Sequence, residues 1–205
     1  MDWDGYKAET DERGKFVMNK VPPGQRGLIR LIQTEANSWV HAQNIPVEVK
    51  PGETTEVTLG GTGATISGHA DGQAVMAGKE GARLHGCLST PSPRPPEGFK
   101  TPEEYRAWAE LPEVKAAQQA VRNYTAEMKP DGTFSFDGVA PGQYTLNLMA
   151  MMPKPDGQRW ETVQLGQTSV PVNVPETAAN GTVSLELGEL PLQPVPVPPI
   201  QPSGQ

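Results

Sequence analysis

Apolar and polar residues alternate along several short stretches of this chain, and glycine or proline ends each stretch. Tyr144–Leu148 and Thr182–Leu187 are clear examples, since Val183, Leu185 and Leu187 recur at every second position. Side chains two residues apart lie on one face of a pleated strand. Asp-Gly and Pro-Gly pairs between the stretches supply the residues that tight turns require. The pattern predicts an all-β fold of short strands, either a sandwich or a barrel.

The pattern occurs twice, at a constant offset of 118 residues. Five residues are identical at that offset, and both copies continue into an alternating strand, a variable loop and a closing strand. The closing strand is expected at Thr55–Leu59 in the first copy and at Thr182–Leu187 in the second. A fixed internal period indicates a duplicated structural unit. The matching pairs are Gly14 and Gly132, Phe16 and Phe134, Val21 and Val139, Pro23 and Pro141, and Gly24 and Gly142.

The two copies are not equally complete. Two further strands are predicted ahead of the second copy, at Ala64–Gly68 and Ala82–Ser89, but only about ten residues precede the first. We therefore expect residues 1–61 to be the C-terminal part of a first sandwich (the first repeat) and residues 62–190 to be a complete second one (the second repeat). A glycine-rich hinge is expected between them. Unpaired sheet edges are unfavourable, so either an N-terminal portion or a neighbouring chain is expected to complete the first repeat.

A helical insertion is predicted within the second repeat, at about 101–127. Thr101-Pro102-Glu103-Glu104 forms a capping box with proline at the first helical position. An apolar stripe follows, and Pro112 interrupts it, so one kinked helix or two short helices are expected. Packing of this stripe on the sheet is favoured over a docking face, because amphipathic stripes usually face a core. The stripe consists of Tyr105, Trp108, Leu111, Val114, Ala117, Val121 and Tyr124.

Prolines recur from Pro191 to Gln205 without strand alternation. This composition favours an extended polyproline conformation, so residues 191–205 are predicted to be a semi-rigid linker or tail. A proline-rich ligand for SH3-like domains is the less favoured alternative, because flanking basic residues are lacking.

The charge balance excludes one class of partner. The chain has 17 Lys and Arg against 24 Asp and Glu, a net charge of −7, which would repel a nucleic-acid backbone. No apolar run is long enough to span a bilayer, and the polar start, Met1–Thr10, lacks the apolar stretch of a signal peptide.

No catalytic or metal-binding pattern is present, and no cofactor is expected. His41, His69 and His85 do not fall into a zinc spacing, and the single cysteine, Cys87, cannot form an internal disulfide. His85 and Cys87 share a face of a predicted strand, which requires no catalytic role. The glycines near residue 60 precede a strand and not a helix, so they do not form a phosphate cradle.

The repeated turn-and-strand unit resembles the carboxypeptidase regulatory-like domain family. The residues that carry the resemblance are Asp11, Gly14 and Phe16 with Val21-Pro22-Pro23-Gly24, and Asp131-Gly132 and Phe134 with Val139-Ala140-Pro141-Gly142. The resemblance implies tandem transthyretin-like sandwiches of the starch-binding-like group, usually extracytoplasmic in bacterial secreted, periplasmic or cell-envelope proteins. It implies no catalytic residues. The missing opening strands of the first copy and the helical insertion of the second are departures from the family pattern.

Three functions follow as hypotheses. The leading one is a non-enzymatic structural or interaction module that positions neighbouring domains of a larger protein. The second is carbohydrate binding, because aromatic side chains in loops or in the insertion can stack on sugars. The third is partner recognition by addition of a strand to the incomplete first module. The candidate stacking residues are Trp39, Tyr105, Trp108 and Trp160.

Overall fold

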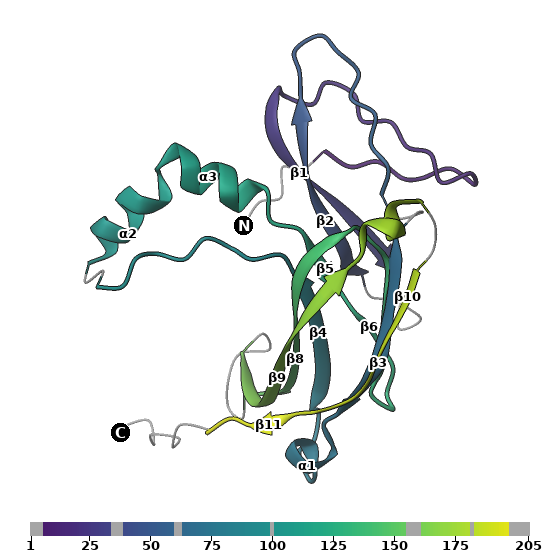
Figure 1. Cartoon of the computed structure of the whole chain (residues 1–205), viewed down its shortest axis with the longest axis vertical. Helices are drawn as coiled ribbons and strands as arrows, with labels where there is room; N and C mark the ends of the chain where they lie inside the picture. Colours follow the sequence, from purple (N-terminus) through teal and green to yellow (C-terminus); the bar gives the residue numbers. More distant parts are fainter. Residues whose placement is uncertain are drawn as a thin grey trace.

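The chain folds into two β-sheets that pack face to face (Figure 1). The computed structural model describes residues 6–33, 39–59, 63–98, 101–154, 161–180 and 183–196. The architecture is mostly β, as the alternating pattern predicts, and it is consistent with an all-β sandwich.

The larger sheet has seven strands, in the order β1-β2-β5-β4-β8-β9-β11. All its neighbouring strands are antiparallel. The sheet runs through both repeats, because β2 of the first repeat pairs with β5 of the second. Its strands are β1 (Gly24–Gln33), β2 (Trp39–Val49), β4 (Arg83–Ser89), β5 (Asn123–Thr125), β8 (Gly142–Pro153), β9 (Thr162–Val174) and β11 (Gln193–Pro194).

The smaller sheet belongs to the second repeat alone. Its order is β10-β3-β7-β6, and its central strand β3 runs parallel to β10 and antiparallel to β7. These strands are β3 (Ala64–Asp71), β6 (Glu127–Met128), β7 (Thr133–Val139) and β10 (Val183–Pro191). The remaining elements are the helices α1 (Gln73–Met76), α2 (Pro102–Ala109) and α3 (Pro112–Gln119), and a 3₁₀ turn at Glu176–Asn180.

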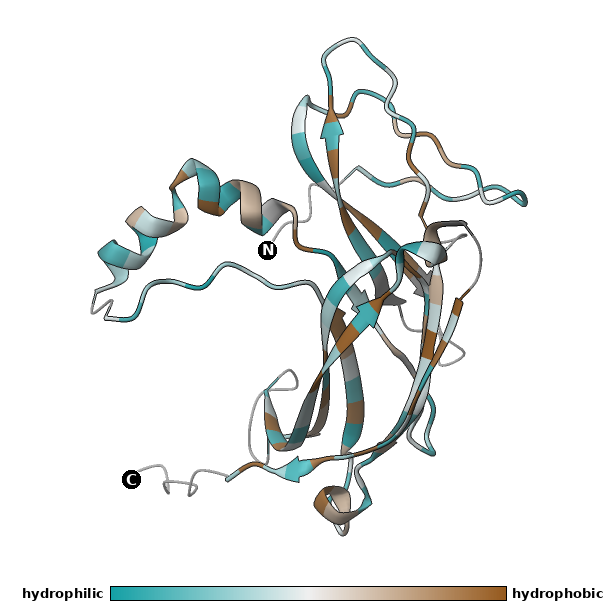
Figure 2. Ribbon diagram, in the orientation of Figure 1, coloured by the Kyte–Doolittle hydropathy of each residue, from teal (hydrophilic) through white to brown (hydrophobic). Residues whose placement is uncertain are grey.

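The core lies between the two sheets of the second repeat. Buried and partly buried positions alternate along β3, β7 and β8, as period-two strands with one inward face require. In Figure 2 brown hydrophobic positions recur along these strands, while α2 and α3 are mixed in colour. The largest fully buried side chains are Tyr124, Phe134, Ile66, Leu88, Leu146, Leu148, Val139 and Val174.

The two repeats share backbone conformation at the offset of 118. The Asp11 N–H donates to the Lys15 carbonyl at 2.8 Å, and at the equivalent place the Lys129 N–H donates to the Thr133 carbonyl, also at 2.8 Å. The glycine of each turn has positive φ, 73° in the first repeat and 92° in the second. In each repeat the next turn leads into an antiparallel hairpin whose first glycine pairs with a valine, Gly24 with Val49 and Gly142 with Val174. The two valines are 125 residues apart, so the offset of 118 does not extend to the second strand of the hairpin.

The match extends to positions where the residue types differ. Lys20, with φ of 58°, is the only non-glycine with positive φ among the described residues, and its counterpart is Gly138, with φ of 66°. The Arg26 guanidinium donates to the carbonyl of Pro22, four residues earlier, at 3.1 Å. Its counterpart Tyr144 donates its hydroxyl to the Ala140 carbonyl, also four residues earlier, at 2.8 Å. The same turn is therefore held by different side chains in the two repeats.

The described part of the first repeat has no counterpart of the smaller sheet. Residues 15–21 correspond to β7 at the offset of 118, and residues 55–59 are where the closing strand was expected, but neither segment pairs with any described strand. The prediction of a strand at Thr55–Leu59 is therefore wrong. In the second repeat both counterparts pair with β3, and the described part of the first repeat offers no equivalent of β3. An apolar alternation cannot form a strand where no partner supplies hydrogen bonds.

Two other sequence predictions need correction. The insertion ends as helix at Gln119, not near residue 127, and Tyr124 lies in β5 with its ring in the core. The predicted tail from Pro191 begins as sheet, because β10 includes Pro191 and Gln193–Pro194 pair with β9. The Leu192 side chain between them is buried. Burial of Leu192 stabilises this segment, which explains why strand pairing continues into the proline-rich stretch.

Candidate functional site

The helical insertion projects from the sandwich as an arm (Figure 1). It leaves the sheet after β4 and returns just before β5. At its base the Thr90 N–H donates to the Arg122 carbonyl, and the Arg122 N–H donates to the Thr90 hydroxyl, each at 3.0 Å. This reciprocal pair closes the sheet beneath the arm.

The first helix of the arm begins where the sequence predicts. The Thr101 hydroxyl accepts from the Glu104 N–H at 3.2 Å, and the Glu104 carboxylate accepts from the Thr101 N–H at 3.1 Å. This is the expected capping box, which satisfies two N–H groups at the helix start. Pro112 begins α3, so the insertion contains two short helices.

The apolar stripe predicted to pack on the sheet does so only in part. No residue of α2 is buried, and the side chains of Tyr105 and Leu111 are 50% and 42% exposed. In α3 the Val114 side chain is buried and the helix contacts β1. The exposed first half of the stripe, on α2, leaves a face open to a partner.

The arm brings together two of the four candidate stacking residues. The rings of Tyr105 and Trp108 lie 5.5 Å apart between centroids, tilted by 51°. Residues three apart on a helix share a face, which explains the proximity. Trp39 begins β2, but its side chain lies outside the described part, and Trp160 lies wholly outside it. The candidate sugar platform is thus the Tyr105–Trp108 pair.

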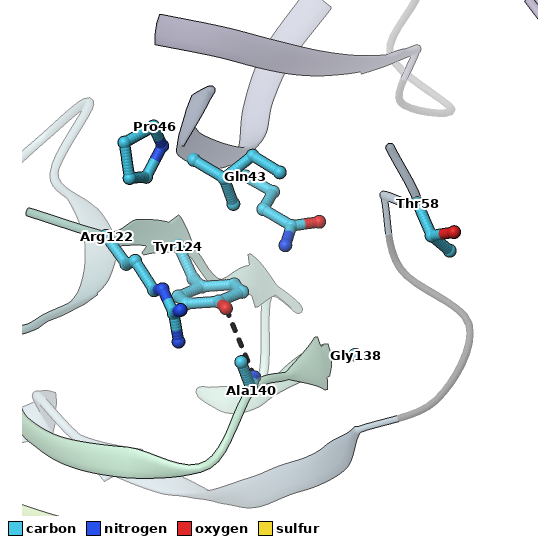
Figure 3. Close-up of a pocket in the computed structure, with 8 residues that line it drawn as sticks. Gln43, Pro46, Thr58, Arg122, Tyr124, Gly138 and Ala140 are labelled. Carbon is cyan, nitrogen blue, oxygen red and sulfur yellow. Dashed lines mark hydrogen bonds between the residues drawn. The ribbon is translucent and has the colours of Figure 1, made fainter. Parts of the chain in front are cut away.

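A second site is a cavity of about 200 Å³ at the junction of the two repeats (Figure 3). Both repeats contribute to its wall, which mixes amide, hydroxyl, guanidinium and apolar groups. Its lining residues are Gln43, Ile45, Pro46, Thr58, Arg122, Tyr124, Gly138 and Ala140.

One lining residue, Tyr124, acts with the neighbouring Tyr144 to hold both backbone polar groups of Ala140. The Tyr124 hydroxyl accepts from the Ala140 N–H at 3.2 Å (Figure 3), and the Tyr144 hydroxyl donates to the Ala140 carbonyl at 2.8 Å. The two rings meet edge to face, 5.9 Å apart. Burial of the Tyr144 hydroxyl is the main reason that its pKa is raised to about 12, and the neighbouring Tyr124 contributes to the same shift. A phenol that stays neutral and bound to backbone is suited to holding a turn, not to accepting a proton from a substrate.

Cys87 and His69, which the sequence analysis considered for chemistry, lie where they support the fold and show no catalytic arrangement. Cys87 is partly buried in β4, and burial raises the pKa of its thiol, which disfavours the nucleophilic thiolate. His69 Nε2 lies 2.7 Å from the Asp131 carbonyl oxygen and ties β3 to the turn before β7. Within the described ranges there is no group of three or more His, Cys, Asp or Glu that could hold a metal ion. No helix in those ranges is long and apolar enough to cross a membrane.

One signal in the sequence was missed. The repeat extends upstream of Asp11, because Tyr6, Ala8 and Glu9 match the tyrosine, alanine and glutamate of Tyr124–Glu127 at the same offset. Tyr124 and Ala126 are buried, whereas Tyr6 is 49% exposed. Residues 6–9 thus correspond to β5 and the start of β6, and no described segment of the first repeat corresponds to β3 or β4.

Comparisons with protein-family models, with curated proteins and with solved structures found no match to this chain.

Proposed function

We propose that this chain is a non-catalytic scaffold segment of a larger secreted or cell-envelope protein. In this proposal residues 1–61 end one transthyretin-like sandwich of the carboxypeptidase regulatory-like kind, and residues 62–190 form the next. The segment spaces neighbouring domains and offers them surfaces to bind. The observation that carries the proposal is the shared conformation of the repeats at the offset of 118, down to the positive φ of Lys20 and Gly138.

The contacts between the repeats support a load-transmitting role. The hairpin of β1 and β2 continues the second repeat's sheet through β5, and the junction cavity is lined from both sides. Duplicated sandwiches that share a sheet hold their ends at a defined spacing, which is what a connecting segment between domains requires.

The proposal predicts that the two repeats differ in autonomy. Residues 63–196, expressed alone, should unfold cooperatively in urea, because their core is complete. Residues 6–59 alone should show no cooperative transition, since a hairpin without a second sheet is at best marginally stable. Circular dichroism during urea titration measures both.

Two results would contradict the proposal that the chain is a non-catalytic scaffold. One is failure of residues 63–196 to fold alone. The other is hydrolase or redox turnover by the purified 205-residue chain that disappears in Cys87→Ala.

Carbohydrate binding is the second candidate function, and the Tyr105–Trp108 pair on α2, in which Tyr105 is half-exposed and Trp108 partly buried, favours it. Two aromatic rings on a projecting helix present a surface on which the apolar face of a sugar ring can stack.

This candidate makes a prediction about the arm. Against glycans identified on an array, changing both Tyr105→Ala and Trp108→Ala should weaken binding at least tenfold, which corresponds to about 1.4 kcal/mol. Leu111→Ala is the matched control, because Leu111 is exposed on the same arm without an aromatic ring. Titration followed by tryptophan fluorescence gives the affinity of the parent chain and the control. An array without any bound glycan would remove the candidate.

A further inference from the structure

The junction cavity lies at the pairing that joins the two repeats. Gln43 of β2 and Tyr124 of β5 both line it, and these two residues are partners in the β2–β5 pairing. Thr58 of the first repeat and Gly138 of the second also belong to its wall. A molecule bound in the cavity would therefore contact both repeats at once.

The cavity carries a positive charge and no negative one. Among the described residues that line it, Arg122 is the only one with a charged side chain. The Arg122 side chain is partly buried, and no carboxylate of the described chain forms an ion pair with it. The group that interacts with its guanidinium is the neutral hydroxyl of Tyr144. A partly buried guanidinium without a counter-charge favours an anionic ligand.

Neutral hydrogen-bonding groups accompany this charge. The Gln43 side chain is only 7% exposed, and in the view of Figure 3 the Tyr124 hydroxyl lies between the Gln43 amide and the Arg122 guanidinium. The backbone of Arg122 is held in place, because its N–H and its carbonyl both bond to Thr90. Donors that are fixed before a ligand arrives lose little entropy when they bind it.

The rest of the wall is apolar, and the space is small. Ile45, Pro46 and Ala140 contribute apolar groups to a cavity of about 200 Å³. Pockets for drug-sized ligands measure roughly 300–1,000 Å³, so this cavity suits a smaller molecule. An inorganic anion would match the charge of Arg122 but would leave the apolar wall without a partner.

We propose that the junction cavity binds a small organic carboxylate. The carboxylate lies against the Arg122 guanidinium and accepts from the Gln43 amide, while the short apolar part of the ligand packs on Ile45 and Pro46. This inference goes beyond the scaffold proposal, because it assigns the segment a small-molecule ligand. Since the ligand contacts both β2 and β5, its binding should also stabilise the short pairing between the repeats.

The experiment titrates the ¹⁵N-labelled 205-residue chain with sodium butyrate at constant ionic strength and follows the amide resonances by NMR. We expect saturable shifts at Gln43, Tyr124 and Ala140, with a dissociation constant of about 1 mM, because so small a ligand makes few contacts. Butyramide has nearly the same shape without the charge, and inorganic phosphate has charge without the apolar part. Each should bind at least tenfold more weakly than butyrate.

Variants of the lining residues locate the site. Arg122→Gln removes the charge and should weaken butyrate binding at least tenfold, whereas Arg122→Lys keeps the charge and should lose less. Arg94→Gln is the matched control, because it removes the same charge from an exposed residue that does not line the cavity. It should bind butyrate as the parent chain does.

A second variant keeps the test valid if Arg122→Gln does not fold. Thr58 is exposed and lies in a stretch that pairs with no described strand, so Thr58→Trp should leave the melting temperature unchanged within a few degrees. The larger side chain would occupy the cavity and weaken butyrate binding at least tenfold.

Hydrogen–deuterium exchange tests the coupling between ligand and pairing. With butyrate at ten times its dissociation constant, amides of β2 and β5 that exchange when this pairing opens should exchange about tenfold more slowly. Amides in the β8–β9 hairpin serve as the internal reference and should be unaffected.

Four results would overturn the inference. They are the absence of saturable shifts with butyrate at tens of millimolar, binding of butyramide or phosphate as tight as that of butyrate, full affinity in a folded Arg122→Gln variant, and shifts confined to residues away from the cavity. The scaffold proposal is tested separately, by the folding of residues 63–196, so the two can fail independently.

Discussion

Phe134→Ala should destabilise the chain by about 3–5 kcal/mol, whereas Phe16→Ala should cost less than about 1 kcal/mol. The two phenylalanines occupy the same place in the two repeats. Phe134 lies in the core, edge to face with Phe136 at 5.9 Å, and its ring faces β3. Removal of this ring leaves a cavity that close-packed strands cannot fill. Phe16 has no second sheet to pack against in the described chain.

The measurement is the free energy of unfolding from urea titration, with the midpoint and the slope analysed separately. Phe134→Leu serves as a control that keeps most of the volume and should lose less than Phe134→Ala. Equal losses for Phe16→Ala and Phe134→Ala would mean that the first repeat has a packed core of its own, which would contradict the prediction.

Gly132→Ala should lower the free energy of unfolding by about 2–5 kcal/mol, whereas Gly14→Ala should lower it by about 1–2 kcal/mol. Both glycines have positive φ, so both substitutions carry the backbone strain of an L-residue there. A Cβ on Gly132 would lie only 2.5 Å from the Ala70 carbonyl oxygen in β3, while one on Gly14 would meet nothing within 4 Å. The Ala70 N–H also donates to the Gly132 carbonyl at 2.9 Å, so a shift of the turn disturbs that bond.

Thermal unfolding of the two variants beside the parent chain tests this difference. The strain common to both turns cancels in the comparison, and the remainder reports the presence of β3. A Gly14→Ala loss as large as that of Gly132→Ala would contradict the prediction, because it would require a neighbour beside Gly14.

The features that sequence predicted well depend on local chemistry. Asp-Gly and Pro-Gly turns form because glycine adopts positive φ without strain, and the capping box forms because Thr101 and Glu104 satisfy each other's N–H groups. The strands from Tyr144 and from Leu28 are present for the same kind of reason, since their alternation gives each one a face to bury.

The features that sequence missed depend on partners distant in the chain. Thr55–Leu59 has the alternation of a strand, yet strand formation requires a neighbour such as β3. Tyr124 continues a helical spacing, but pairing with β4 and bonding of its hydroxyl to Ala140 place it in the sheet. The spacing of Tyr105, Trp108 and Leu111 defines a helix face without saying what covers it, so it could not reveal that the arm projects.

Of the four aromatic residues considered for sugar stacking, helical spacing alone sufficed to place two together. Tyr105 and Trp108 are one turn apart, whereas any meeting with Trp39 or Trp160 would depend on strand order and loop path. Those are tertiary properties that a single sequence does not specify.

The junction of the repeats has a mechanical consequence. β2 and β5 share only two residue pairs, Gln43 with Tyr124 and Asn44 with Asn123, whereas β8 and β9 share twelve. If the chain connects neighbouring domains as proposed, tension along it should separate β2 from β5 before either hairpin opens, because fewer backbone hydrogen bonds hold this pairing. The chain would then lengthen in two steps. The first repeat would detach first, and the second repeat would stay folded until a larger force is applied.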